Sequence, residues 1–309
     1  MWAFFQKLAL SASLLLGTLS GSPAVYALDP ARLIPPGHFI DLGTHRLYYE
    51  CMGTGRPAVL IDYGIGSSAI AWRDLQRQIS RETTACAYDR AGYGWSDPGP
   101  APRTTQLAAE EIHALLDQMP VDGPVVLVGH SFGGFNTRYF AARWPDRVAG
   151  LVWLDSSHPA EALGAKSNPG SRLRNPIDAS RLGAEGGDDD QAIGAYLNTR
   201  RKAIFTQMDE LTHFADSARQ VLEAGALPPV PLLVLVRDAA KGEPSEATEA
   251  RWHANQATLA ALSPQGRLWP ATGSGHDIHR DRPDLVVKAV HEVLVTVRQH
   301  RDVAAVAKP

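Results

Sequence analysis

Short apolar runs alternate along the chain with segments of helical periodicity, and this alternation limits the possible folds more than any other feature. Strand-length apolar runs occur at residues 39–42, 46–51, 58–61, 85–88, 125–128, 151–154 and 232–236, and a shorter one at 267–269. Apolar residues with helical spacing occur at 105–119, 135–144 and 285–297. The alternation predicts an α/β protein with a mostly parallel sheet covered on both faces, and the first two strands form an antiparallel pair at one edge.

One long segment breaks the alternation. Residues 158–228 contain no convincing strand run, and helical periodicity returns only from Ala192 onward. A cluster of prolines then closes the segment and leads into the next strand. We therefore expect a core of residues 28–157 and 229–300, a helical insertion at 158–228 and a tail at 301–309.

The first 27 residues differ in composition from the rest. Lys7 is the only charged residue before Asp29, and Leu8 begins an apolar run broken only by Ser, Thr and Gly. Such a run, followed by small residues that end at Ala27, predicts a secretory signal peptide cleaved after Ala27 and a periplasmic or secreted protein. The alternative is an uncleaved anchor, because residues 8–27 match a marginal bilayer span. Only in that case do we expect membrane contact.

The charge balance excludes one class of partner. The 309 residues carry a formal net charge of −3, and basic and acidic residues are mixed along the chain. Nucleic-acid binding needs a basic surface, which this composition does not predict. With 44% hydrophobic residues the chain can bury a large core, so we expect a globular protein.

The only two cysteines, Cys51 and Cys86, lie in segments with high β-propensity. An oxidising compartment would permit a disulfide between them. Two buried free thiols would fit the same pattern, so the residues alone leave both possibilities open.

A serine between glycines follows the apolar run at 125–128. Residues 125–134 read Val-Val-Leu-Val-Gly-His-Ser-Phe-Gly-Gly, with Ser131 between a strand and a helix. A GxSxG turn at such a junction strains the serine backbone and exposes the hydroxyl, while Gly129 and Gly133 prevent clashes. Backbone N–H groups at the helix start can stabilise developing negative charge. The pattern predicts that Ser131 is a nucleophile.

A nucleophilic serine needs a base and an acid that orients the base. His276 is the preferred base among eleven histidines because it lies in a Gly-rich loop between a strand-like run and a helix. His279 is its only close rival. Asp155 and Asp238 each follow a strand, and parallel strands end at one shared edge, so the residues alone do not decide between these acids.

Two groups of potential metal ligands have simpler explanations. The three aspartates at 188–190 are consecutive in a Gly-rich stretch, whereas a metal site needs spaced ligands, so we expect a solvated turn. His276 and His279 flank Asp277, but three residues on one loop are poor support for a metal site. We expect no metal and no organic cofactor.

Four separated motifs resemble those of the α/β-hydrolase superfamily, and the resemblance covers nearly all of the chain after residue 27. They are the oxyanion loop at 62–68, a DxxGxGxS turn at 89–96, the nucleophile elbow at 129–133, and Gly275-His276 followed by Asp281-Arg-Pro. The resemblance implies an eight-stranded, mostly parallel sheet with a helical cap. It also implies that the backbone N–H groups of Ile65 and Phe132 form the oxyanion hole.

Two further expectations depend on this resemblance. The family strand order would place the strand of Cys51 beside that of Cys86, which favours a disulfide. Some relatives take the acid from the strand end that Asp155 matches, so we favour Asp155 over Asp238. The chain departs from the pattern at Tyr63, where many members carry histidine, and we expect this change to alter the pocket floor.

The resemblance implies a serine hydrolase that cleaves a carboxylic ester through an acyl-enzyme, using Ser131, His276 and Asp155, so its expected partner is a small-molecule ester or amide substrate. Aminopeptidases of the proline-iminopeptidase type share the elbow, and an acidic cap residue such as Glu161 or Asp209 would then hold the substrate amine. A catalytically silent ligand-binding protein is a third possibility, although the retained triad argues against it. Related enzymes that open epoxides or remove halides carry aspartate at the serine position.

Overall fold

The computed structural model describes residues 33–163, 189–242 and 245–306. The chain divides into two units, Met1–Ile34 and Pro35–Pro309, and the strands of the described residues belong to the second. The predicted leader, residues 1–27, lies outside the described residues. Within those residues, no helix combines the length and the apolarity that crossing a membrane would need.

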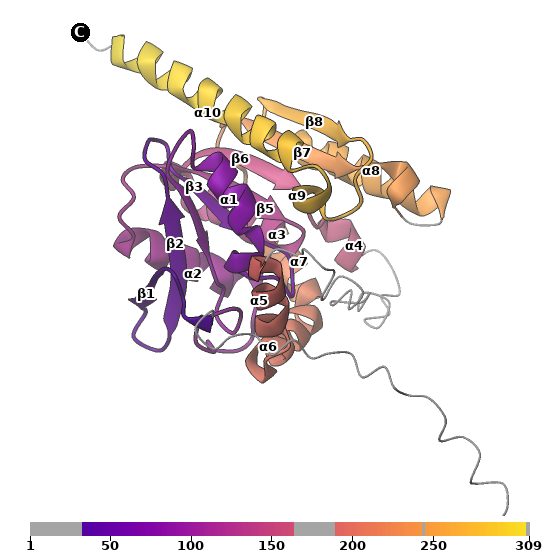
Figure 1. The fold of residues 1–309 in the computed structure, drawn as a ribbon. Coiled ribbons are helices and arrows are strands. Elements are labelled where there is room, and N and C mark those ends of the chain that lie inside the picture. Colours follow the sequence, from indigo (N-terminus) through magenta and orange to yellow (C-terminus); the bar gives the residue numbers. More distant parts are fainter. Residues whose placement is uncertain (1–32, 164–188, 243–244, 307–309) are drawn as a thin grey trace, which may run out of the picture. The chain divides into compact units, whose positions relative to one another are not determined.

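Eight strands form a single sheet in the order β1-β2-β4-β3-β5-β6-β7-β8 (Figure 1). The pairs β1–β2 and β2–β4 are antiparallel, and every other pair is parallel. The predicted mostly parallel, eight-stranded sheet with an antiparallel edge is therefore confirmed. The strands are β1 (His38–Asp41), β2 (Arg46–Met52), β3 (Val59–Asp62), β4 (Ala85–Tyr88), β5 (Val125–His130), β6 (Val148–Leu154), β7 (Leu232–Arg237) and β8 (Gly266–Ala271).

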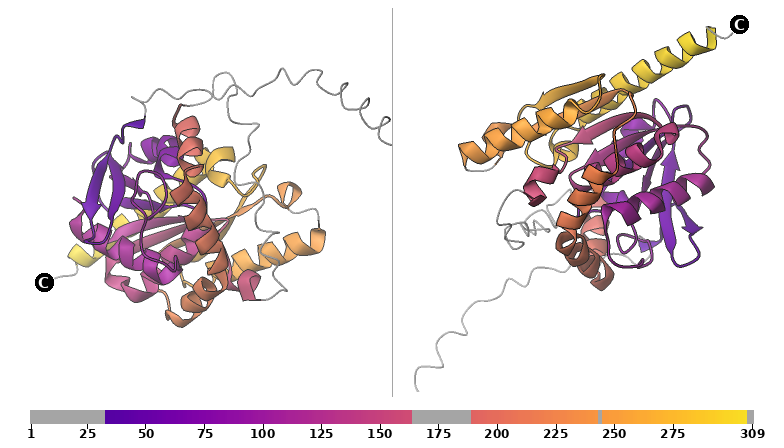
Figure 2. Two further views of the ribbon diagram at one scale, coloured as in Figure 1. Left: turned by 90° about the horizontal axis from the view of Figure 1, so that it is seen from below. Right: turned by 180° about the vertical axis from the view of Figure 1, so that it is seen from behind.

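Helices cover both faces of this sheet (Figure 2). Alternate residues of a strand point to opposite faces, so Leu127 of β5 packs in one core with α2 and α3, and Val126 and Val128 pack in another with α1 and α10. Burial on both sides explains why the central strands are continuous apolar runs. The core helices are α1 (Arg73–Ile79), α2 (Thr105–Gln118), α3 (Phe132–Arg143), α8 (Glu246–Ala260), α9 (Ile278–Asp281) and α10 (Pro283–Val306), with 3-10 turns η2 (Ala69–Trp72), η3 (Pro145–Arg147) and η6 (Ala239–Lys241).

Between β6 and β7, the regular secondary structure of the described residues is all helical. This segment contains α4 (Pro159–Leu163), α5 (Asp189–Asn198), α6 (Arg201–Thr212) and α7 (Phe214–Glu223), and we refer to these four helices as the cap. Residues 164–188 lie outside the described part, so the proposed cap boundaries at 158 and 228 remain predictions.

Two expectations need correction. Asp190, expected in a solvated turn, lies in the first turn of α5, is buried, and forms an ion pair with Arg77 at 2.8 Å. The helix α10 continues to Val306, so residues 301–306, expected as a tail, are helical. The position of Asp190 has a physical reason, because the helix dipole stabilises a carboxylate near a helix N-terminus.

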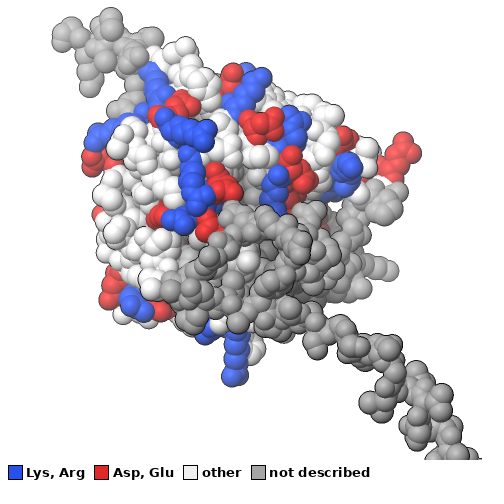
Figure 3. Space-filling model, viewed as in Figure 1, with Lys and Arg blue, Asp and Glu red and all other residues white. Residues whose placement is uncertain are grey.

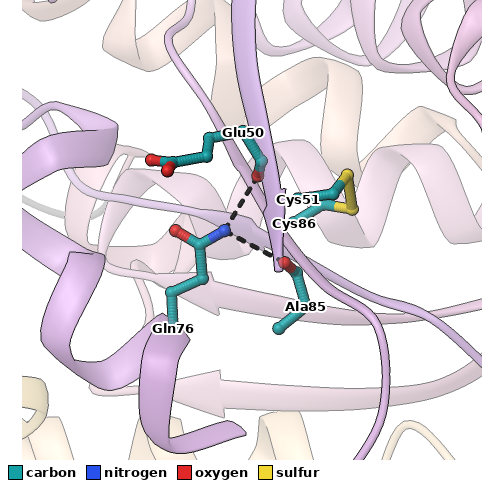
Figure 4. The surroundings of a disulfide bond; sticks show 5 residues. All are labelled: Glu50, Cys51, Gln76, Ala85 and Cys86. Carbon is teal, nitrogen blue, oxygen red and sulfur yellow. Dashed lines mark hydrogen bonds between the residues drawn. A yellow bond between two sulfur atoms is a disulfide. The ribbon is translucent and has the colours of Figure 1, made fainter. Parts of the chain in front are cut away.

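A disulfide joins Cys51 of β2 to Cys86 of β4 (Figure 4). The two cysteines are register partners in the antiparallel pair, with Cα atoms 4.1 Å apart. Beside them, the amide of Gln76 donates to the carbonyl oxygens of Glu50 at 2.8 Å and Ala85 at 3.0 Å. The antiparallel edge is thus tied to the parallel part of the sheet by a covalent bond and by a side-chain bridge from α1.

The surface charges agree with the mixed charge of the sequence. On the face seen in Figure 3, basic and acidic side chains of the described residues are interspersed. Several form exposed pairs, such as Arg46 with Asp97 at 2.8 Å. Exposed pairs of this kind contribute little to stability, about 0–1 kcal/mol each.

Candidate active site

The carboxyl ends of β5 and β6 bring Ser131 and Asp155 to the same edge of the sheet. His130 and Leu154 are register partners, and the next residue on each strand is Ser131 or Asp155. The Ser131 N–H donates to the Leu154 carbonyl at 3.2 Å, and the Ser131 carbonyl accepts from Ser157 N at 3.0 Å. The two predicted site residues therefore start from neighbouring, hydrogen-bonded backbones.

Ser131 has a strained backbone. Its φ of 52° and ψ of −119° lie outside the regions that L-residues normally occupy, and it caps the N-terminus of α3. The glycines around it are required by close packing. A Cβ at Gly133 would lie 2.2 Å from the Asp62 carbonyl oxygen, and one at Gly129 would lie 2.8 Å from the Gly133 carbonyl oxygen. This is the geometry expected of a nucleophile elbow.

His276 is hydrogen-bonded to Asp155, with 2.7 Å between Nδ1 and Oδ2. Because an ionised carboxylate only accepts hydrogen bonds, Nδ1 carries the proton and Nε2 is left as a base. Partial desolvation by the surrounding protein would lower the pKa of His276, but the hydrogen bond and the charge of Asp155 outweigh it and raise this pKa. Burial likewise opposes ionisation of Asp155, and the bond to His276 outweighs it and lowers the pKa of Asp155.

Asp238, the alternative acid, has a different role. Its carboxylate accepts hydrogen bonds from the backbone N–H groups of Gly273 at 2.7 Å and Ala240 at 3.0 Å. These two bonds lower its pKa. Asp238 therefore fixes the loop before His276, and the structure places Asp155 beside the imidazole.

Arg237 and Trp252 hold the Asp155 carboxylate in place, and neither was expected from the sequence. Asp155 accepts from Trp252 Nε1 at 2.6 Å, and from the backbone N and Nη1 of Arg237, each at 3.1 Å. The Arg237 guanidinium also pairs with Glu249 and stacks over the Trp252 ring. One indication of this arrangement was present in the sequence, because the charged residue Arg237 directly follows the apolar run 232–236.

His130, the residue before Ser131, links the elbow to the histidine loop. Its Nε2 lies 3.1 Å from the His276 carbonyl oxygen, and the rings of His130 and His276 have centroids 4.8 Å apart. Burial and the neighbouring His276 lower the pKa of His130 to about 4, so it is neutral at physiological pH. A neutral ring donates from Nε2 to this carbonyl and so ties the loop of His276 to the residue that precedes Ser131.

No hydrogen bond joins the Ser131 hydroxyl to His276 among the described residues. Catalytic bonds of this type are often long before substrate binds. The His276 side chain is 42% exposed, whereas that of Asp155 is fully buried. The base is therefore open to an incoming ligand while its orienting acid is shielded from water.

His130, Asp277 and His279 form one group of potential metal ligands. Their ligand atoms all lie within 4.8 Å of one another. Two zinc–nitrogen bonds of about 2.1 Å can span at most about 4.2 Å, so the group is looser than a preformed site. His279 instead stacks on Trp72 with ring centroids 3.7 Å apart. The arrangement supports a packed aromatic cluster better than a metal centre.

The two expected oxyanion donors belong to segments that lie beside Ser131. A Cβ at Gly64 would lie 3.1 Å from the Cβ of Ser131, so the loop carrying Ile65 passes next to the nucleophile. Phe132 is the first residue of α3, and N–H groups in a first helical turn lack helical acceptors. Within the described part of the chain, neither the Ile65 nor the Phe132 N–H donates a hydrogen bond. Both are available for a substrate oxygen.

Tyr63 corrects one expectation. It was expected to alter the floor of the pocket, but its side chain is fully buried and its hydroxyl donates to Asp89 Oδ1 at 2.8 Å. Burial is the main cause that raises its pKa well above the usual value. Tyr63 thus ties the oxyanion loop to the turn at 89–96.

The two acidic cap residues suggested for amine binding occupy different positions. Asp209 of α6 accepts a hydrogen bond from the Arg103 backbone N at 2.5 Å. Its carboxylate therefore anchors the cap to the loop before α2. Glu161 lies in the first turn of α4.

Comparisons with known proteins agree with this geometry. A family model described as alpha/beta hydrolase fold matches residues 57–175. The chain is 28% identical over 290 residues to the 2-(acetamidomethylene)succinate hydrolase of Mesorhizobium japonicum, covering 85% of this chain and 98% of that protein. It is also 36% identical over 170 residues to lipase LipV of Mycobacterium tuberculosis. This match covers 53% of this chain and 61% of the lipase. The solved enol-lactonase of Burkholderia xenovorans shares the fold, with a TM-score of 0.62 and 18% identity over 84% of this chain and 100% of that one.

Proposed function

The chain belongs to the α/β-hydrolase superfamily and is a hydrolase by its relatives, and from this premise we propose that it cleaves a carboxylic ester by a Ser-His-Asp mechanism. The observation that carries the proposal is the 2.7 Å bond between His276 and Asp155 at the sheet edge where strained Ser131 caps the N-terminus of α3. A hydroxyl, a base and an orienting acid in this order are the requirements for acyl transfer.

In the proposed reaction, His276 Nε2 takes the Ser131 proton as the serine oxygen attacks the ester carbonyl carbon. Asp155 stabilises the imidazolium, and the N–H groups of Ile65 and Phe132 bind the tetrahedral oxyanion. The C–O bond to the alcohol then breaks, and the alcohol leaves with the proton from His276. Water, deprotonated by His276, then attacks the acyl carbon. The bond to the Ser131 oxygen breaks, His276 returns the proton to that oxygen, and the carboxylic acid is released.

Ester cleavage is favoured over removal of an N-terminal residue. Asp209, a candidate for holding a substrate amine, is already bonded to the Arg103 backbone. A lipase and an enol-lactonase among the similar proteins are both named for breaking carboxylic ester bonds. A silent binding protein has no need for an exposed base with a shielded acid, which disfavours the third alternative.

We also propose that the protein is exported, with an N-terminal anchor as the alternative. The composition of residues 1–27 supports export, and so does the Cys51–Cys86 disulfide, since such bonds persist mainly in oxidising compartments. Sequencing the N-terminus of the protein produced from its full chain in a bacterial host tests this. Leu28 as the first residue supports cleavage, and an intact Met1 supports an anchor.

A substrate panel tests the proposed activity. Nitrophenyl esters of graded acyl length and aminoacyl nitroanilides are given to the unmodified protein and to Ser131→Ala. We expect the unmodified protein to hydrolyse esters far faster than anilides, and the variant to hydrolyse neither. Faster anilide cleavage would replace the esterase proposal with the aminopeptidase, and an inactive unmodified protein would support a binding role.

A further inference from the structure

A buried ion-pair network connects the cap to the loop that carries the oxyanion donor. Arg90 lies two residues after the end of β4, and Glu210 lies in α6. Their side chains are 0% and 2% exposed, respectively. Arg90 Nε donates to Glu210 Oε1 at 3.0 Å, and Nη2 donates to Oε2 at 3.3 Å. Arg90 Nη1 also donates to Asp62 Oδ1 at 2.7 Å. A charged group buried this deeply is tolerated only with such partners.

The same guanidinium holds two backbone carbonyls of the oxyanion loop. Nη2 donates to the Gly64 oxygen at 3.1 Å, and Nη1 donates to the Tyr63 oxygen. The Gly64 carbonyl and the Ile65 N–H belong to one planar trans peptide group, so they point in opposite directions. By holding this carbonyl, Arg90 fixes the direction in which the Ile65 N–H points.

Tyr93 gives a second route from Glu210 to the loop. Its hydroxyl donates to Glu210 Oε2 at 2.7 Å and accepts from the Gly66 N–H at 3.3 Å. Gly66 has a φ of +78°, and a Cβ there would lie 2.9 Å from the Gln207 side chain of α6. The cap helix therefore packs directly against the residue that follows the donor Ile65.

We propose that Arg90 is a positioning residue for the oxyanion donor Ile65, and that Glu210 makes this positioning depend on the docking of α6. This inference depends on the ester hydrolysis proposed above. Separating α6 from the core would leave Arg90 without one carboxylate and Tyr93 without its acceptor. The Gly64 peptide could then rotate, and the oxyanion hole would lose a donor. Docking of the cap helix α6 and stabilisation of the transition state are therefore coupled.

Two substitutions in the network test the inference. Glu210→Gln keeps the shape and one acceptor oxygen but removes the charge that holds Arg90. Arg90→Lys keeps a charge, but a single ammonium group cannot reproduce the fork of donors to two carboxylates and two carbonyls. We expect kcat and kcat/KM for a nitrophenyl ester to fall by the same factor, about 10-fold for Glu210→Gln and about 10²-fold for Arg90→Lys. KM should change little, because the oxyanion exists only in the transition state.

Glu111→Gln is a matched control. Arg103 and Glu111 form an equally buried pair, with 2.6 Å between Nη1 and Oε1 and side chains 5% and 4% exposed. No hydrogen bond of this pair reaches residues 62–66 in the described part of the chain. We expect Glu111→Gln to lower Tm without changing kcat, whereas the network variants lower both.

The affinity for a boronic acid, which mimics the tetrahedral intermediate, gives a second measurement. Both network variants should bind it more weakly by the factor seen in kcat, at unchanged KM. If they keep normal kcat and boronic acid affinity while Tm falls as in Glu111→Gln, the network only stabilises the fold and the inference is wrong. If the unmodified protein shows no Ser131-dependent hydrolysis, the proposed function fails and this inference fails with it.

Discussion

His276 Nδ1 and Asp155 Oδ2 lie 2.7 Å apart, although 121 residues separate them in the sequence. The carboxylate has little freedom to move, because Arg237 and Trp252 supply three further hydrogen bonds. Asp155 also has a positive φ of 42°, which turns the chain sharply after β6. The position of the imidazole is therefore set by groups from β6, β7 and α8 together.

Replacing each candidate acid separately tests this pairing. Asp155→Asn should lower kcat for an ester by about 10⁴-fold, because an amide no longer stabilises the imidazolium or fixes its tautomer. Asp238→Asn should stay within a few-fold of normal, since its amide oxygen can still accept from Gly273 and Ala240. Near-normal rates for both variants would show that neither residue orients His276.

The pH dependence of kcat/KM should reflect His276. The base must be neutral in the free enzyme, and Asp155 raises its pKa above the usual histidine value of 6.5. Activity should therefore be low in acid and rise with pH, with a midpoint above 6.5. The residual activity of Asp155→Asn should show this rise at lower pH. A midpoint below 6.5 in the unmodified enzyme contradicts the assignment of His276 as the base.

Trp252→Phe removes one hydrogen bond to Asp155 and keeps most of the ring. The bond is 2.6 Å long, and a hydrogen bond to a charged group contributes about 1.5 kcal/mol or more, so kcat should fall about 10-fold. Trp144→Phe is the control. Trp144 directly follows α3, and its replacement should leave kcat unchanged. Equal rates for the two variants would remove Trp252 from the support of Asp155.

The sequence predicted those parts of the fold that are buried on both faces. β5 is recognisable because every residue from Val125 to His130 is buried and most are apolar. α8 was not predicted, since its buried residues include Glu249 and Gln256, which bond to Arg237 and the Ser156 carbonyl and interrupt any apolar period.

The residues of the candidate site also differ in how far the sequence alone predicts them. Ser131 and His276 stand in local patterns that the sequence displays directly. Asp155 and Asp238 each directly follow one of two neighbouring strands, β6 and β7, so the two residues differ only in the partners that their side chains reach. Pairs such as Arg90 with Glu210, 120 residues apart, depend on how the cap packs, and no local pattern encodes that.

The disulfide should stabilise the fold without affecting catalysis. It closes a loop of 35 residues, so replacing both Cys51 and Cys86 with Ser should lower the free energy of unfolding by about 3–4 kcal/mol on the chain-entropy model. Denaturant titrations of the two proteins measure this difference, and kcat should be unchanged. Reductant should destabilise the unmodified protein alone. Equal stability before and after reduction would mean that the bridge adds nothing.

The most direct measurement is the mass of the protein after brief reaction with a fluorophosphonate or a slow nitrophenyl ester. We predict one covalent adduct, located on the peptide that contains Ser131, and no adduct in Ser131→Ala. The same variant should lose ester hydrolysis by at least about 10³-fold. An adduct on another residue, or unchanged hydrolysis by Ser131→Ala, would contradict acyl transfer through this serine.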